Sequence, residues 1–447
     1  MPDSQSPQPV RRGALAFIFV TVLVDVLALG IVIPVLPKLV ENFLGGNTAG
    51  AARIFGAFGT VWALMQFIFA PILGMVSDRF GRRSVILISC LGLGLDYAFM
   101  ACAPTLGWLF VGRIISGITA ASFATAGAYI ADVTPSERRA ASYGFLGAAW
   151  GFGFAFGPAL GGLLGGINPR LPFWVAAVLA LANAAYGWFV LPESLPPEKR
   201  SPRFVWARAN PVGSLRLLRS HHELFGLAAI YFIVFVAHQV LTSVFVLYSM
   251  FRYRWTESQV GLCLAIVGIC SIVVQGILVK PIVPRLGERR ALLLGLVFGV
   301  AGFAIFGWAP SGAAFCCGIP VFALIGFFGP SAQSLMSKRV SPSEQGQLQG
   351  ANSSLMGIAG MIGPGLFTLI FAHYIAPTRT VQIPGAAFYL ASVLMGGAFV
   401  AAWMATRSMP MRPPGPGRAE ETPPLTEEFE LGESGEPGAT QVTYPAS

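Results

Sequence analysis

Charged side chains are scarce in this sequence of 447 residues. Only 11% of the residues are Asp, Glu, Lys or Arg, whereas 55% are hydrophobic. An ordinary soluble domain carries roughly 25% charged residues. This deficit argues against a soluble globular protein, because water is not the main solvent of such a chain.

Two kinds of binding chemistry are also missing from the sequence. No GxxxxGK[ST] phosphate-binding loop occurs, and the six cysteines show no CxxC spacing. ATP is therefore not expected to be an energy source, and neither a metal site nor a cofactor is predicted. The net charge of +9 does not indicate a nucleic-acid partner, because the basic residues lie in alternate loops between apolar segments.

Long apolar runs, by contrast, fill most of the chain. Each is about twenty residues long, which is the length of helix that crosses a bilayer core of about 30 Å. The runs lack the alternation of a barrel strand, and a backbone in hydrocarbon must satisfy its own hydrogen bonds. The predicted fold class is an all-α polytopic membrane protein with twelve transmembrane helices, at about 14–36, 53–74, 84–103, 106–130, 141–165, 171–191, 224–250, 258–283, 291–309, 313–336, 349–375 and 384–405.

Charge and internal repetition suggest how these helices are organised. Basic residues gather in the loops on one side, so the positive-inside rule places both termini in the cytoplasm. The first run is full length, and no cleavable signal peptide is expected. SDRFGRR at 77–83 is echoed by VPRLGERR at 283–290, which predicts two pseudo-symmetric six-helix halves. The predicted division is an N-terminus 1–13, a first half 14–191, a linker 192–223, a second half 224–405 and a disordered acidic tail 406–447.

Ionisable residues inside the predicted spans are the strongest functional signal. Asp25, Asp96 and Arg113 lie within the first, third and fourth spans, and each costs about 2.5–3.5 kcal/mol to insert unless it faces a cavity or a partner. An acid beside a cavity can exchange a proton with water, and a nearby arginine stabilises the ionised form of such an acid, so these three residues are predicted to couple protons to transport. The alternative is a structural ion pair between Asp96 and Arg113.

Two glycine-containing motifs add conformational hypotheses. GMVSDRFGRR follows the second span and can latch one conformation, although a loop that only sets topology is the alternative. GFGFAFGPALGG in the fifth span predicts a kinked, closely packed helix. The latch residues are Gly74, Asp78, Arg79, Gly81, Arg82 and Arg83, and the helix-five residues are Gly153, Gly157, Pro158, Gly161 and Gly162.

Weaker candidates for substrate contact are polar or aromatic residues within the spans. Each is more often ordinary packing than a ligand contact. They are Gln66, Trp62, Trp150, His238, Asn352 and Phe235.

Together these motifs resemble the major facilitator superfamily. The loop at 74–83 looks like its signature loop, LFVGRIISG around Arg113 is similar to its proton-linked fourth-helix motif, and GPALGG is similar to its antiporter motif. LVDVLALGIVIPVLP, LDYAFMA, GAYIADVT and EQGQLQG resemble bacterial class A/C tetracycline efflux proteins over about residues 14–405.

That resemblance implies a specific transport cycle. It implies alternating access and exchange of a proton for a small amphipathic drug, with a tetracycline chelate carrying Mg²⁺ as the best guess. It adds Asp132, within GAYIADVT, to the latch. It also implies a functional monomer in the bacterial cytoplasmic membrane, whose partners are the substrate, protons and the lipid bilayer.

Two departures from the resemblance leave other functions open. The family's eighth-helix histidine is Ser271 here, and its ninth-helix aspartate is Gly299. A different substrate or coupling route, a nutrient importer, or a transporter-derived sensor that signals through the acidic tail are the alternatives. Deleting residues 410–447 separates the sensor from a transporter, which should keep its activity without the tail.

Overall fold

The structure is a computed structural model that describes residues 12–120, 122–134, 139–201, 215, 217–218, 222–341 and 344–407. Within these ranges every regular element is a helix and none is a strand, which confirms the all-α fold class. Most of the predicted linker and nearly all of the predicted tail lie outside the described residues, so both remain predictions.

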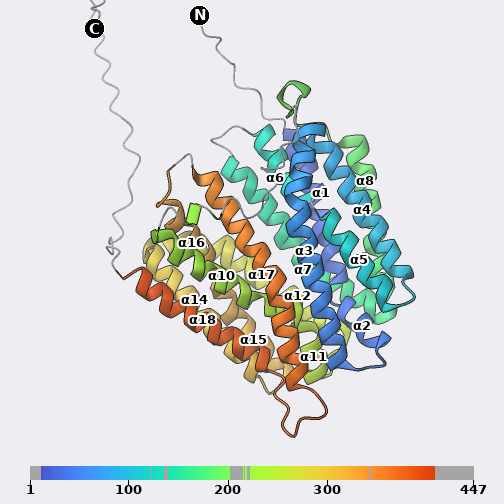
Figure 1. Cartoon of the computed structure of the whole chain (residues 1–447), viewed down its shortest axis with the longest axis vertical. Helices are drawn as coiled ribbons and strands as arrows, with labels where there is room; N and C mark the ends of the chain where they lie inside the picture. The colour runs from blue at the N-terminus through green and yellow to red at the C-terminus, as the bar shows by residue number, and fades with distance from the viewer. Residues whose placement is uncertain are drawn as a thin grey trace, which may run out of the picture.

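The helices before the linker pack into one bundle, and those after it pack into a second bundle (Figure 1). The first bundle comprises α1 (Arg12–Val32), α2 (Leu36–Phe43), α3 (Thr48–Phe80), α4 (Arg82–Cys102), α5 (Leu106–Thr119), α6 (Ser122–Val133), α7 (Arg139–Ile167) and α8 (Leu171–Val190). The second comprises α10 (His222–Ser243), α11 (Phe245–Tyr253), α12 (Glu257–Val273), α13 (Val279–Leu286), α14 (Glu288–Trp308), α15 (Gly312–Ala323), α16 (Phe328–Ser337), α17 (Gln345–Tyr374) and α18 (Ala386–Ala405).

Among the described residues, eleven helical segments are long and apolar enough to cross a membrane. The fourth predicted span, 106–130, is divided between α5 and α6. Helix α5 ends at Thr119, whose hydroxyl donates to the Ile115 carbonyl at 3.0 Å, and Ala120 leaves the helical conformation with ψ of 44°. Such bonding of a threonine back to its own helix often bends it. The sequence prediction of one continuous fourth helix was therefore wrong.

Three other predicted spans also contain irregular helix. Residues 33–35, which include Pro34, separate α1 from α2. A π-helical segment, Val274–Leu278, separates α12 from α13, and a 3-10 segment, Leu324–Phe327, separates α15 from α16. These two irregular segments contact each other within the second bundle. Apolar length alone does not show such breaks, because the hydropathy of the chain continues through them.

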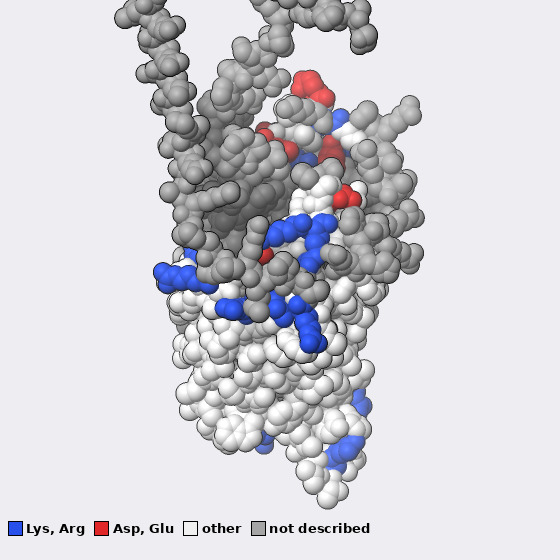
Figure 2. Space-filling view, turned by 90° about the vertical axis from the view of Figure 1, so that its left-hand side faces the viewer, with Lys and Arg blue, Asp and Glu red and all other residues white. Residues whose placement is uncertain are grey.

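The outer surface is suited to lipid. Large apolar side chains point outward, including Phe189 at 84% and Trp188 at 65% exposure. Figure 2 shows a broad uncharged belt, with Lys and Arg side chains gathered above it and a few below it. An apolar belt between charged ends is the surface expected of a protein that spans a bilayer.

The two bundles meet along two pairs of helices, α7 with α12 and α3 with α17. A Cβ added to Gly268 of α12 would lie 2.6 Å from the Cα of Ala155 in α7. Across the other seam, the Thr60 hydroxyl donates to the Met361 carbonyl at 3.0 Å. Backbones this close leave no passage between them.

These seams lie toward the end of the molecule away from the two termini (Figure 1). The Ser258 hydroxyl, near the start of α12, donates to the Gly162 carbonyl near the end of α7 at 3.1 Å. At the same end, Glu41 in α2 lines a polar pocket together with Arg254 and Trp255, which follow α11. The structure is therefore closed at the end opposite the termini.

The repeated glycine motif has the same conformation in both bundles. Gly81 and Gly287 each precede a helix with positive φ, at 102° and 80° respectively. Glycine reaches this region without the steric cost that a Cβ would add. Glu288 follows the second glycine and pairs with Lys338 at 2.5 Å, whereas Arg82 follows the first and pairs with a carboxylate. In both repeats the residue after the glycine forms an ion pair, but this residue is basic in the first bundle and acidic in the second.

Candidate functional site

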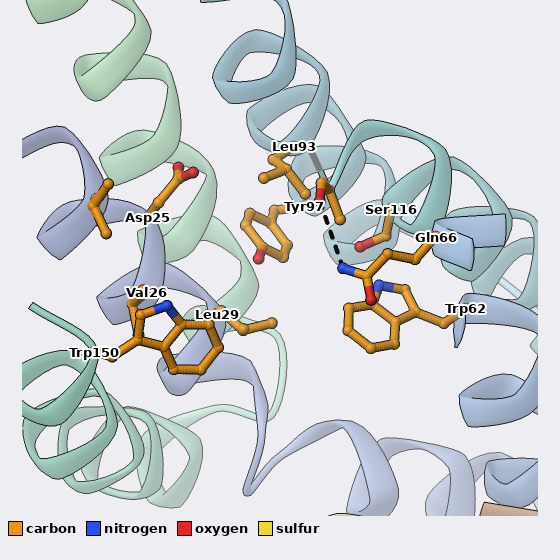
Figure 3. Close-up of a pocket in the computed structure, with 11 residues that line it drawn as sticks. Asp25, Val26, Leu29, Trp62, Gln66, Leu93, Tyr97, Ser116 and Trp150 are labelled. Carbon is orange, nitrogen blue, oxygen red and sulfur yellow. Dashed lines mark hydrogen bonds between the residues drawn. The ribbon is translucent and has the colours of Figure 1, made fainter. Parts of the chain in front are cut away.

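A cavity of about 90 Å³ lies inside the first bundle, between α1, α3, α4, α5 and α7. Figure 3 shows Asp25 and Trp150 on one side of this space and Gln66 and Trp62 on the other. Apart from one carboxylate and a few polar groups, its walls are apolar. The lining residues are Val22, Asp25, Val26, Leu29, Trp62, Gln66, Leu93, Tyr97, Ser116, Ala120 and Trp150.

Among the described residues of this wall, Asp25 is the only charged one. It lies on the face of α1 that also carries Val22, Val26 and Leu29, at helical spacings of three and four residues. The Asn183 amide nitrogen of α8 lies 3.5 Å from its Oδ1 atom. A carboxylate in a mainly apolar cavity is a group that can take up and release a proton as the cavity opens to water.

Asp96 and Arg113 lie behind the cavity wall and do not line the cavity. Both are buried, at 1% and 8% exposure, and no ion pair joins them in the described part of the chain. Arg113 instead donates to the Ser116 hydroxyl at 3.1 Å and approaches the Met100 sulfur at 3.7 Å. The direct ion pair considered from the sequence is therefore wrong for this state.

Ser116 links these buried charges to the cavity. Its hydroxyl faces the cavity, accepts from Arg113 and lies beside the Asp96 carboxylate. Both Asp96 oxygens are buried without a hydrogen-bond partner that the described residues supply at normal bonding geometry.

The predicted substrate contacts divide between the two bundles. Trp62, Gln66 and Trp150 line the cavity, and the Gln66 amide points toward the Ala120 carbonyl at 3.5 Å (Figure 3). His238 and Asn352 belong to the second bundle and do not line this cavity.

The two second-bundle candidates pack against their own neighbours. The His238 ring stacks on Phe322 with centroids 5.9 Å apart, and the Asn352 amide donates to Gln333 at 3.0 Å. Phe235 packs on Tyr231, with ring centroids 4.6 Å apart. The structure therefore assigns these residues no place in the first-bundle cavity, and their predicted contact with substrate stays a prediction.

Sequence reasoning missed two polar groups in the cavity wall, Tyr97 and Ser116. Tyr97 directly follows Asp96 on α4, and Ser116 comes three residues after Arg113 on α5. Residues at this spacing on a helix share a face, so helical spacing from Arg113 was the signal that could have identified Ser116. Tyr97 gave no such signal, because neighbouring residues on a helix point in different directions.

The glycine motif of α7 packs against two partners. Gly157 faces α1, where an added Cβ would lie 2.8 Å from the Cα of Gly30. Gly153 and Gly161 face α1 as well. Gly162 faces the other bundle, where an added Cβ would lie 3.0 Å from the Cα of Gly261. The motif therefore places α7 tightly between the cavity helix α1 and the seam helix α12.

The predicted latch residues are brought together at the end of the first bundle where the chain starts. Arg82 lies 2.5 Å from the Asp78 carboxylate and 3.1 Å from that of Asp132. Its guanidinium also donates to the Ser77 hydroxyl at 3.1 Å. One arginine therefore ties α3, α4 and α6 together.

The other predicted latch residues have different surroundings. Arg79 is exposed and lies over the Phe80 ring at 5.4 Å. Arg83 donates to the Trp188 carbonyl of α8. At Gly74 an added Cβ would meet no atom within 4 Å. Close packing is therefore not the reason for a glycine at that position.

Glu193, which the sequence analysis did not single out, completes the latch. Its Oε1 atom accepts from the backbone N–H groups of Arg82, Ser194 and Leu195 at 2.9, 3.0 and 3.1 Å. The bond from Arg82 caps the N-terminus of α4, where Gly81 has no side chain to do so. The first residues after α8 are in this way fixed to the latch.

We expect Arg82→Ala to slow transport about tenfold, because both ion pairs to Arg82 are lost and each partly exposed pair contributes about 0.2–1 kcal/mol. The measurement is the export rate at equal amounts of protein in the membrane. Arg79→Ala is the matched control, since Arg79 lies in the same loop, and it should leave the rate within about twofold. Equal rates for the two variants would contradict a latch centred on Arg82.

Ser271 and Gly299 occupy different environments. Ser271 is partly exposed on α12. Gly299 is buried in α14, where an added Cβ would lie 3.0 Å from Ile325 and 3.4 Å from the sulfur of Met395. The ninth-helix position therefore has no space for a carboxylate without a shift of its neighbours.

Comparison with known proteins gives consistent matches. Residues 18–364 match the family model for the Major Facilitator Superfamily. The chain is 38% identical over 384 residues to the class C tetracycline resistance protein of Escherichia coli, covering 85% of this chain and 95% of that protein. It is 29% identical over 362 residues to multidrug resistance protein 2 of Bacillus subtilis, covering 79% and 88%.

Solved structures show a similar arrangement of helices. A nucleoside transporter matches with a TM-score of 0.70 at 14% identity, covering 89% of this chain and 100% of that one. A human organic anion transporter matches with a TM-score of 0.67 at 24% identity, covering 88% and 100%. At these identities the likeness supports the fold alone.

Proposed function

This chain belongs to the major facilitator superfamily, and from that premise we propose that it is a proton-coupled antiporter that exports a small amphipathic drug. It is a multi-pass membrane transporter, and its tetracycline resistance relatives support drug efflux. A tetracycline-type substrate, carried as a chelate with Mg²⁺, is the proposed cargo. The magnesium is part of the substrate and not a resident cofactor.

One observation carries the proposal: of the cavity-lining residues that the structure describes, which are mainly apolar and include two tryptophans, Asp25 is the single carboxylate. Flat aromatic walls suit an amphipathic ring system, and the carboxylate offers either a proton-binding site or a negative charge to a cationic substrate. Because a proton and a cationic substrate cannot both bind to Asp25 at the same time, proton binding and drug binding compete. Competition of this kind is what an exchange mechanism requires.

The conformation fits one step of an alternating-access cycle. The bundles are closed at the end away from the termini. If both termini are cytoplasmic, as the charge pattern predicts, this is the state that receives drug from inside the cell. Separation of the α7–α12 and α3–α17 seams then releases it outside.

The proton gradient supplies enough energy for export. A membrane potential of 100 mV is worth about 2.3 kcal/mol for each charge moved, and about 1.4 kcal/mol corresponds to a tenfold concentration ratio. One proton exchanged for a neutral drug therefore supports about 40-fold accumulation from the potential alone, whereas exchange for a singly charged chelate moves no net charge and is driven by the pH difference, at about tenfold for each pH unit.

Drug-evoked proton release from energised inverted vesicles tests the function. We expect tetracycline with Mg²⁺ to release protons from vesicles that contain the protein, and control vesicles without it to stay silent. Release only with unrelated amphipathic drugs would keep the antiport mechanism and reject tetracycline as the substrate. Silence with every compound would reject drug–proton exchange and favour the importer or sensor alternatives.

A further inference from the structure

Asn183 of α8 is a buried amide at the junction of α1, α4 and α8. Its side chain is 3% exposed, and its Nδ2 atom donates to the Thr21 carbonyl at 2.8 Å. The same nitrogen lies 3.5 Å from Oδ1 of Asp25 and 3.7 Å from the sulfur of Cys90. One N–H is thus fixed on the backbone of α1, and the other is shared by the carboxylate and the thiol.

The other end of this amide has no partner. The Oδ1 atom of Asn183 is buried and accepts no hydrogen bond from the described residues. An unsatisfied buried acceptor costs about 1–3 kcal/mol, so its presence calls for an explanation. Asp25, one turn from Thr21 on α1, is the neighbouring group whose hydrogen-bonding character changes during the proposed cycle.

The two protonation states of a carboxyl group need different partners. An ionised carboxylate only accepts hydrogen bonds, whereas a protonated one also donates through its hydroxyl. An amide offers a donor and an acceptor side by side. The nitrogen of Asn183 suits the ionised state of Asp25, and its unoccupied oxygen suits the protonated state after a small rotation of the Asp25 side chain.

We propose that Asn183 is the positioning residue of Asp25, because its amide donates to the ionised carboxylate and accepts from the protonated one. The Asp25 side chain then keeps its place in the cavity wall in both protonation states. This inference rests on the proposed proton exchange and names a further residue that tunes it. Asn183 itself neither touches the cavity nor carries a proton.

Other groups around Asp25 can also influence its protonation. From α4, the Cys90 thiol and the Tyr97 hydroxyl interact with it, and Tyr97 also interacts with the charges of Asp96 and Arg113. Among the described residues, those that line the cavity from the remaining helices are uncharged: Trp62 and Gln66 of α3, Ser116 and Ala120 of α5 or its end, and Trp150 of α7. The Asn183 amide of α8 differs from these groups, because it combines a donor near Asp25 with an acceptor that no described residue uses.

Carbodiimide labelling tests the proposal without relying on transport. A hydrophobic carbodiimide modifies protonated carboxyl groups in membranes, and mass spectrometry locates the label. In Asn183→Ala the ionised form of Asp25 loses a donor, so we expect its labelling midpoint to rise by about one pH unit. Labelling of Asp96 in the same molecules should keep its midpoint and so serves as an internal control.

Two further variants separate positioning from folding. Asn183→Ser retains one hydroxyl that can donate and accept, and its shift should be less than half that of Asn183→Ala. Ser331→Ala removes another buried polar atom, in the second bundle, that has no hydrogen-bond partner among the described residues, and it should leave the Asp25 midpoint unchanged. All variants are compared only as proteins that elute as a single species with the wild-type melting profile.

The possible results are distinct. An Asp25 midpoint in folded Asn183→Ala within about 0.2 pH units of wild type would overturn the positioning role. An equal shift at Asp96 would overturn it too, because the change would then be general. If wild-type vesicles show no drug-evoked proton release but the Asp25 midpoint still shifts, the proposed function fails and the positioning role stands.

Discussion

Asp25→Asn should abolish drug-evoked proton movement while leaving the protein folded. Asparagine has nearly the shape of aspartate but cannot take up a proton in this range, so the variant lacks the proposed coupling group. Active accumulation of drug driven by the proton gradient should fall to the equilibrium level. The measurements are proton release and uptake of labelled drug in energised inverted vesicles.

Loss of coupling must be distinguished from loss of the protein. Glu198→Gln makes the same acid-to-amide change at an exposed residue of the short 3-10 helix Pro197–Lys199, and it should transport normally. Asp25→Asn should still exchange drug down its own gradient, because the cavity remains. Normal uphill export by Asp25→Asn would remove Asp25 from the mechanism, and coupling would then have to rely on Asp96.

Gly162→Ala should weaken the closed seam between the bundles. The added methyl group would overlap the Glu257 carbonyl of α12 and lie 3.0 Å from the Cα of Gly261. Overpacking of this kind costs about 1–3 kcal/mol, and only the state closed at this end bears the cost. The equilibrium should therefore shift about 10- to 100-fold toward opening at this end, and transport should slow by at least about tenfold.

A cysteine at the second seam reports this opening from a distance. Thr60→Cys on α3, in a background where the exposed Cys102 and Cys317 are serine, should react faster with a membrane-impermeant maleimide when Gly162→Ala is also present. Gly397→Ala on α18 is the matched control, because an added Cβ there meets no atom within 4 Å. Unchanged labelling with Gly162→Ala would show that α12 absorbs the methyl group locally.

Gly161→Ala, one residue earlier, should behave differently. Its added methyl group would overlap the Ile31 carbonyl of α1, which belongs to the same bundle. The overpacking therefore destabilises the closed and the open conformation alike. The melting temperature should fall, but labelling at the seam should not become faster. Faster labelling in this variant would argue that α1 and α7 move relative to each other during the cycle.

Much of the candidate site could be predicted from the sequence because charges inside the membrane are rare. Asp25, Asp96 and Arg113 could be identified from the cost of inserting a charged side chain into the membrane. Arg82 and Asp132 could be identified from the motifs that contain them. The partners of these groups were not predictable in the same way. Nothing in the local sequence of Asn183 distinguishes it from an ordinary packing residue of an apolar helix, and only the spacing of three residues from Arg113 pointed to Ser116.

The sequence by itself determined the class of protein, the number of apolar runs and the residues that carry charge into the membrane. These follow from hydropathy and length, which are properties of each segment considered alone. It also indicated the repeat, because SDRFGRR at 77–83 is echoed by VPRLGERR at 283–290, and the structure shows that Gly81 and Gly287 in these motifs both take a positive φ.

Only the tertiary structure decided which of these residues meet. It placed Asp25 in the cavity and Asp96 behind it, separated Asp96 from Arg113, and left His238 and Asn352 in the other bundle. It also showed that neighbouring glycines in α7 face different partners, since Gly161 packs within its bundle and Gly162 across the seam. The physical reason is that helix–helix packing sets the rotation of every helix about its axis, and a hydropathy pattern that is apolar on all sides does not encode that rotation.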